Sequence, residues 1–167
     1  MTNFGVVVDM GAGEGTLSQL LAQNSDQVIA VDHAEKMVEY GASLAKEHSL
    51  DNLEYRLGDL QNPPVDAGTA DLVVFSQALH HATDPEKALK AAAVILKKGG
   101  KLLVLDLLQH NFEQAKELYG DTWLGFAELD LIKMAKKAGF TNLESAVVDR
   151  EEEPPNFQTL LVTGVKG

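Results

Sequence analysis

Short apolar segments alternate with longer amphipathic segments from the start of the chain. The apolar segments are rich in valine, isoleucine and leucine, and they occupy residues 5–9, 27–32, 53–57, 71–76 and 101–107. Continuous apolar runs of this length are typical of strands that are buried on both faces of a parallel sheet. The segments between them have the spacing of amphipathic helices, most clearly at 14–23 and 34–48. The alternation predicts an α/β fold with a mostly parallel sheet.

The helix that follows the fourth predicted strand has clear signals at both ends. Asp84 is a residue type that caps helix N-termini, and Pro85 suits the first helical position. The sequence KKGG at 97–100 suits the C-terminal end of a helix. We therefore expect a helix from Pro85 to about this point.

The last third of the chain has a different pattern. Helices are predicted at 112–119, where apolar residues are few, and at 127–138, where Gly139 ends the helix. Two strands are then predicted at 141–150 and 156–165, with no helix between them. Their connector is acidic and contains proline, so we expect an antiparallel hairpin that closes the sheet.

Composition and charge narrow the class of protein. The chain has 167 residues and a mass of 18.0 kDa, which corresponds to one domain, and 45% of its residues are hydrophobic. Its formal net charge of -11 repels phosphate backbones and anionic membranes. We therefore expect that this chain alone binds neither nucleic acid nor a membrane.

Cysteine usage and hydropathy indicate the compartment. The chain has no cysteine, which excludes disulfides, thiolate metal sites and cysteine nucleophiles. The longest apolar run, 91–96, is far too short to span a membrane, and the N-terminal residues do not have the pattern of a signal peptide. A cytoplasmic location is the default expectation.

The chemistry-bearing residues gather at the carboxyl ends of the five predicted strands. Ligands of open parallel sheets bind beyond these ends, so the ends should form one site. The segments that carry polar residues or glycine there are 9–15, 32–33, 58–59, 76–81 and 106–110.

The first of these segments is DMGAGEG, from Asp9 to Gly15. Its glycines allow a sharp turn and let a ligand lie against bare peptide N–H groups. The NAD fingerprint places its third glycine three residues after the second, but Thr16 stands at that position and the glycine comes one residue early. Asp9 suits a cationic ligand better than a pyrophosphate. The alternative interpretation is a tight turn that binds no ligand.

The second and third strand ends carry the acids Asp32 and Asp59. An acid at the end of the second strand can accept hydrogen bonds from both ribose hydroxyls of an adenosine, in NAD and in S-adenosylmethionine sites alike. Asp59 is placed to accept a hydrogen bond from an adenine amino group, and Gly58 would let the base approach. His33 either packs beside adenine or faces solvent. The alternative for both acids is an ordinary solvated turn.

Together these residues resemble the class I S-adenosylmethionine-dependent methyltransferases. The resemblance runs from DMGAGEG through VIAVDH, RLGDL, DLVVFSQALHH and ILKKGGKLLVLDL to the closing hairpin. It implies a Rossmann-like α/β sandwich whose sheet has seven strands in the order 3-2-1-4-5-7-6, the last of them antiparallel. It also implies S-adenosyl-L-methionine as the cofactor. The expected cofactor-binding residues are Asp9, Gly11, Ala12, Gly13, Asp32, His33, Met37, Gly58, Asp59, Leu60, Ser76 and Gln77.

A narrower resemblance concerns residues 106–126, DLLQHNFEQAKELYGDTWLGF. This segment is similar to the methyltransferase domain that is fused behind winged-helix regulators of the arsenic-repressor type. Family members usually carry helices before the first strand that fold over the cofactor, whereas only residues 1–4 precede Gly5 here. We expect residues 1–167 to be a methyltransferase core without these lid helices. Its cofactor site is then half open, or a second copy or a missing N-terminal domain covers it.

The candidate catalytic residues are His81 and His110. Histidine is the usual base near neutral pH, and methyl transfer to a hydroxyl or amine can use one. His80 is a third candidate, but adjacent side chains point apart and only one of the pair need face the site. Asp106 or Glu113 would orient the histidine. The alternative is that all three histidines cap turns or face solvent.

No metal site is predicted, because His80, His81, Asp84 and His110 do not have a recognised ligand spacing. Trp123 and Phe126 either wall an acceptor pocket or belong to the core.

The sequence thus predicts an S-adenosylmethionine-dependent methyltransferase with an unidentified acceptor, expected to be a small molecule. Two alternatives remain. One is a regulatory module that binds S-adenosylmethionine or S-adenosylhomocysteine without turnover. The other is an NAD-dependent oxidoreductase, which Thr16 disfavours.

Overall fold

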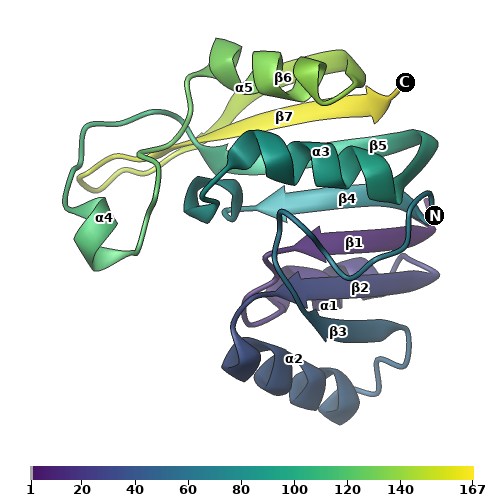
Figure 1. Ribbon diagram of the computed structural model, residues 1–167. Helices are drawn as coiled ribbons and strands as arrows, with labels where there is room; N and C mark the ends of the chain where they lie inside the picture. Colours follow the sequence, from purple (N-terminus) through teal and green to yellow (C-terminus); the bar gives the residue numbers. More distant parts are fainter. Residues whose placement is uncertain (1) are drawn as a thin grey trace.

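The computed structural model describes residues 2–167 as one seven-stranded sheet with helices on both faces (Figure 1). The strands are β1 Val6–Met10, β2 Gln27–Asp32, β3 Leu53–Leu57, β4 Ala70–Ser76, β5 Leu96–Leu107, β6 Phe140–Arg150 and β7 Gln158–Lys166. The helices are α1 Thr16–Ala22, α2 Glu35–Glu47, the 3₁₀ helix η1 Leu79–His81, α3 Pro85–Ile95, α4 Ala115–Leu118 and α5 Glu128–Lys137.

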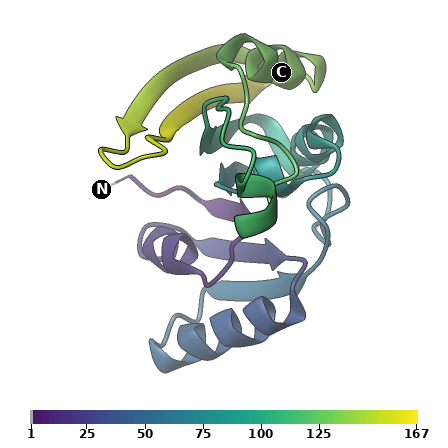
Figure 2. The same cartoon turned by 90° about the vertical axis from the view of Figure 1, so that its left-hand side faces the viewer.

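The strand order is β3-β2-β1-β4-β5-β7-β6, as the sequence predicted. The first five strands pair in parallel, and β7 runs antiparallel to both of its neighbours. The carboxyl ends of β1, β2, β3 and β4 therefore meet at one edge, as the view onto that edge shows (Figure 2). Among the described residues, no helix is both long and apolar enough to cross a bilayer.

Burial on both faces explains the apolar runs of the central strands. Val7 packs with residues of α1 and α2 on one face, while its neighbour Val8 packs with residues of α3 and α5 on the other. Both valines are fully buried. Because successive side chains of a strand point to opposite faces, a strand covered on both sides buries both sets of side chains, which favours apolar residues at most positions.

Two predicted elements differ from those observed. The sequence KKGG at 97–100 lies within β5, because α3 ends at Ile95 and the chain enters the strand directly. Gly99 has a φ of +80° there, which permits the irregular pairing with β4. The predicted helix 112–119 shrinks to the single turn α4, consistent with its few apolar residues.

One buried polar pair joins the first strand to the first helix. The Ser18 hydroxyl of α1 donates a hydrogen bond of 2.6 Å to Oδ2 of Asp9 in β1, and both residues are buried. Burial raises the pKa of the Asp9 carboxyl from 3.8 to about 6. The hydrogen bond from Ser18 opposes this shift, and the charge of Asp32 adds to it.

This pKa makes a prediction about stability. The folded state holds the Asp9 proton more tightly than the unfolded state, so the contribution of this group to stability falls as the pH rises from 3.8 to about 6. The difference corresponds to about 3 kcal/mol. Relative to the wild type, Asp9→Asn should gain about that much stability between pH ~4 and pH ~7.5, as urea unfolding would measure. The variant Asp51→Asn, which changes an exposed acid, is the control. If the difference in free energy of unfolding between the wild type and Asp9→Asn did not change with pH, the raised pKa of Asp9 would be contradicted.

Candidate functional site

The turn after β1 and the tip of β4 are in direct contact at the carboxyl edge. Gly11 has a φ of +78°, and a Cβ built on it would lie only 2.6 Å from Cβ of Ala78. Gln77, which follows β4 directly, has a φ of +53°, a conformation that a non-glycine residue rarely adopts. Such a backbone is held by its surroundings and is typical of functional sites. The single turn α4 lies beyond the ends of β1 and β4 (Figures 1 and 2).

The glycine turn is fastened to the end of β2. The amides of Gly11 and Ala12 donate to the carbonyl of Val31 at 2.8 and 3.0 Å, and the amide of Gly13 donates to Oδ2 of Asp32 at 2.9 Å. These three N–H groups are therefore not free for a ligand, contrary to what the sequence predicts, because each of them donates a hydrogen bond to an oxygen of β2. Gly13 instead provides space: it has a φ of +58°, and a Cβ built on it would meet nothing within 4 Å.

Asp32 organises the backbone on both of its sides. Its Oδ2 accepts from Gly13, and its Oδ1 accepts from the amide of Ala34 at 2.9 Å, just before α2. The residue is only 6% exposed. His33 points outward, with its side chain 81% exposed, and its Nδ1 lies 3.8 Å from Oδ1 of Asp32. Met37, in the first turns of α2, is half-buried.

The third strand end differs in one respect from the expectation. Asp59 is exposed, and its Oδ1 accepts from the amide of Gln61 at 2.9 Å, so its other oxygen is available. A Cβ built on Gly58 would lie 2.4 Å from Cδ of Pro64. The space beside Gly58 is therefore filled by the ring of Pro64, so the lack of a side chain there does not open room for an adenine base. Leu60 is half-buried and packs against the core.

The expectation that the side chains of the two adjacent histidines point apart is wrong, because their ring centroids lie 4.1 Å apart and both rings approach Asp121. His80 is buried, and its Nδ1 donates to Oδ1 of Asp106 at 2.7 Å, while its amide donates to Oδ2 of the same carboxylate at 3.1 Å. Burial lowers the pKa of His80, but hydrogen bonds and charges of Asp106 and Asp121 outweigh burial and raise it. Asp106 therefore orients a histidine, namely His80. Glu113 is exposed and forms an ion pair with Lys116 instead.

His81 is the exposed member of the pair. Its Nδ1 lies 3.1 Å from the carbonyl oxygen of Gly120 and 3.6 Å from Oδ1 of Asp121. Asp121 is buried beside both histidines, and sequence reasoning missed it. No signal in the sequence points to it, because it lies in an irregular loop far from any predicted strand end.

The loop that carries Asp121 is fastened to η1. The amides of Thr122 and Trp123 both donate to the carbonyl of His80, at 3.1 and 2.9 Å, and Nε1 of Trp123 donates to the carbonyl of Ala82 at 2.9 Å. The Trp123 ring lies 6.2 Å from that of Phe126, which is buried.

His110 lies in a more apolar setting. Its Nδ1 accepts a hydrogen bond from the amide of Phe112 at 3.2 Å, so the neutral ring carries its proton on Nε2. That Nε2 is buried and has no hydrogen-bond partner among the described residues. The ring lies 4.5 Å from that of Phe157, and burial lowers the pKa of His110.

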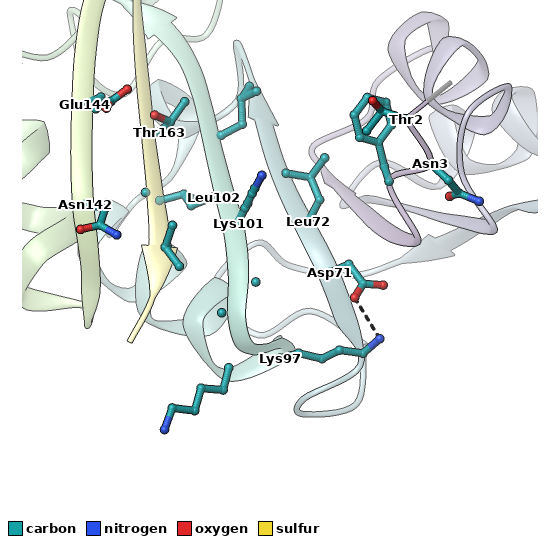
Figure 3. Close-up of a pocket in the computed structure, with 17 residues that line it drawn as sticks. Thr2, Asn3, Asp71, Leu72, Lys97, Lys101, Leu102, Asn142, Glu144 and Thr163 are labelled. Atoms are coloured by element: carbon teal, nitrogen blue, oxygen red, sulfur yellow. Dashed lines mark hydrogen bonds and ion pairs between the residues drawn. The ribbon is translucent and has the colours of Figure 1, made fainter.

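A cavity lies at the opposite end of the strands. It has a volume of about 720 Å³ and is lined by residues 2–4 and by the first residues of β4 and β5 together with parts of β6 and β7. Figure 3 shows Asp71 and Lys97 on its wall, joined by an ion pair of 3.0 Å. None of the predicted site residues lines this cavity.

Comparison with known families and proteins supplies the family. Residues 8–104 match the family model described as "Methyltransferase domain". The ubiquinone biosynthesis O-methyltransferase of Coxiella burnetii is 32% identical over 107 residues, which are 64% of this chain and 45% of that protein. The uncharacterized methyltransferase YcgJ of Bacillus subtilis is 31% identical over 100 residues, 60% of this chain and 40% of that protein. The matched regions thus span less than half the length of these curated relatives.

Solved structures share the fold over the whole chain. The crystal structure of YcgJ from Bacillus subtilis superimposes with a TM-score of 0.81 at 16% identity, covering 99% of this chain and 93% of that one. A geranyl diphosphate methyltransferase in complex with S-adenosylmethionine gives a TM-score of 0.86 at 13% identity, covering 100% and 80%.

The seven-stranded sheet in this order, the glycine turn and the matched family model agree with one another. The chain therefore belongs to the methyltransferase domain family, within the class I S-adenosylmethionine-dependent methyltransferases that its motifs resemble.

Proposed function

We propose that this chain binds S-adenosylmethionine at the carboxyl ends of β1, β2 and β4 and transfers its methyl group to a hydroxyl of a small molecule. The observation that carries the proposal is the carboxylate of Asp32, which holds the glycine turn at Gly13 and the start of α2 at Ala34. It fixes an acid beside an open bend of the backbone, which is the arrangement that an adenosine with a cationic tail requires.

The residues present fit this cofactor. A carboxylate offers about four acceptor positions, and the two backbone amides on Asp32 use one on each oxygen. The two that remain can accept from the two ribose hydroxyls. The free space at Gly13 adjoins this carboxylate and leaves room for the methionine part.

The positions of several other residues suit contacts with the adenine and the methionine part of the cofactor. Asp59 has one carboxylate oxygen free for an adenine amino group. Ser76 and Gln77, at the tip of β4 beside Gly11, suit the methionyl amino group. Asp9 is buried under the turn, so we propose that it acts as a positioning residue through Ser18. We keep Gly11, Ala12, His33, Met37, Gly58 and Leu60 as residues around the ligand.

The bound cofactor supplies a methyl group on a cationic sulfur, which becomes neutral on transfer. The task of the chain is to align the acceptor in line with this bond and to exclude water. We propose His81 as the residue that takes the acceptor's proton, because it is exposed and its Nε2 is not engaged when Nδ1–H donates to Gly120. His110 offers a buried N–H donor, which suits the orientation of an acceptor oxygen.

The names of the relatives support oxygen as the acceptor atom. The Coxiella burnetii protein and a Xanthomonas axonopodis protein, 35% identical over 105 residues, are both named ubiquinone biosynthesis O-methyltransferase. Trp123 is 44% exposed beside the histidines and can provide a wall for an apolar acceptor.

We propose that residues 1–167 form one S-adenosylmethionine-binding core whose crevice is covered from outside these residues. The cover would be a second copy of the chain or an N-terminal domain. The similarity of residues 106–126 to domains fused behind winged-helix regulators favours the N-terminal domain.

Calorimetry with S-adenosylhomocysteine tests the site. Asp32→Ala removes the acceptor of the ribose hydroxyls and should weaken binding by about 1.5–3 kcal/mol. Asp149→Ala, an exposed acid of β6, should leave affinity unchanged. Circular dichroism of both variants checks that they fold. Equal affinity of the two variants, or binding of NAD in place of the sulfur compounds, would contradict the proposal.

Mass spectrometry over a panel of phenolic, amine and thiol acceptors tests the reaction. We expect methylated product from a phenolic acceptor, and we expect His81→Asn to lower kcat by about 10²–10⁴-fold without changing the affinity for S-adenosylhomocysteine. Tight cofactor binding with no product from any acceptor would favour the regulatory module over the enzyme.

A further inference from the structure

Three side chains from two separate segments converge at a point that the proposed cofactor site does not use. His80 and His81 belong to η1, and Asp121 belongs to the loop after α4. One potential ligand atom from each lies within 4.8 Å of the other two. The sequence predicted no metal site, because His80, His81, Asp84 and His110 have no recognised ligand spacing. In the structure Asp84 caps α3 instead, by accepting from the amide of Lys87 at 3.1 Å.

Asp121 has a buried carboxylate oxygen that lacks a partner. Its side chain is 2% exposed, and its Oδ1 forms no hydrogen bond among the described residues. A buried carboxylate is stable only with hydrogen bonds or positive charge beside it, so this oxygen is suited to a cationic partner.

The neighbouring histidine presents a second acceptor to this oxygen. Asp106 takes the proton on Nδ1 of His80, which leaves the lone pair of the neutral ring on Nε2. This Nε2 lies 3.3 Å from Oδ1 of Asp121. Two acceptors at this distance repel each other unless a proton or a metal ion lies between them. A carboxylate on the far nitrogen is also the usual support of a histidine that binds metal.

The distances suit a small tetrahedral ion. Ligands that lie about 2.0–2.1 Å from zinc are separated by about 3.3 Å along a tetrahedral edge. Oδ1 of Asp121 lies 3.3 Å from Nε2 of His80 and 3.6 Å from Nδ1 of His81. The two nitrogens lie within 4.8 Å, and rotation of the exposed His81 ring can bring them closer.

We propose that His80, His81 and Asp121 bind a divalent transition metal ion of the zinc class. Two imidazoles and one carboxylate bind ions of this class in preference to calcium or magnesium, which favour oxygen ligands alone. Three protein ligands leave one position open, which is typical of catalytic rather than structural zinc. The exposed side of His81 provides the entry path, since its side chain is 40% exposed.

This site goes beyond the proposed methyl transfer, and when it is occupied it replaces the role of His81 as the base. Coordination through Nδ1 requires the neutral His81 ring to give up its hydrogen bond to the carbonyl of Gly120 and to carry its one proton on Nε2 instead. His81 is then a metal ligand and no longer accepts a proton, and an acceptor oxygen at the open position would lose its proton to solvent more readily.

The experiment uses tag-free protein that has been treated with chelator and freed of it. Titration with zinc chloride in a calorimeter should show one ion per chain. Titration with cobalt chloride should give the visible absorption of a tetrahedral centre. Zinc at about 100 times its Kd should raise the unfolding midpoint by about 5 °C or more.

Two variants and one control decide the outcome. Asp121→Asn and His81→Asn should each weaken zinc binding by about 10-fold or more, whereas the exposed His48→Asn should leave it unchanged. Because His81 is exposed, its variant should fold even where the buried Asp121 variant does not. No zinc binding by the wild type, or equal binding by wild type and His81→Asn, would overturn the proposal and leave a protonated His80 between its two acids.

Discussion

The carboxylate of Asp32 ties together the parts of the molecule on which the site depends. It accepts one amide from the glycine turn and one from the residue before α2, at 2.9 Å each. Because it is buried at the end of β2, these bonds set the path of both segments relative to the sheet. The same carboxylate keeps acceptor positions free, and for this reason we propose it as the group that binds the ribose.

The fold could be predicted well where burial on both faces determines the sequence. The strands at 27–32 and 53–57 have the predicted bounds, and the order of all seven strands is as expected. The prediction failed where few apolar residues constrain the chain. The segment 112–119 keeps only the turn α4, and the glycines at 99–100 belong to a strand, because the packing of β4 against β5 overrides a local signal of helix termination.

The site could be predicted as a set of strand ends but not in its contacts. Sequence cannot tell a glycine that makes room for a ligand from one that makes room for a neighbour. Gly13 adjoins free space, whereas Gly15 and Gly58 accommodate Tyr55 and Pro64. Nor can it find Asp121, which reaches the histidines only through the path of an irregular loop. Contacts of this kind depend on tertiary structure alone.

The central claim is that an adenosine lies across the ends of β1, β2 and β3 with its ribose on Asp32. A crystal structure of the chain grown with S-adenosylhomocysteine tests it most directly. We expect both ribose hydroxyls within hydrogen-bond distance of the Asp32 carboxylate and the amino-acid tail beside Gly13. A ligand bound instead in the cavity beside Asp71 and Lys97, or a crevice closed by side chains, would contradict it.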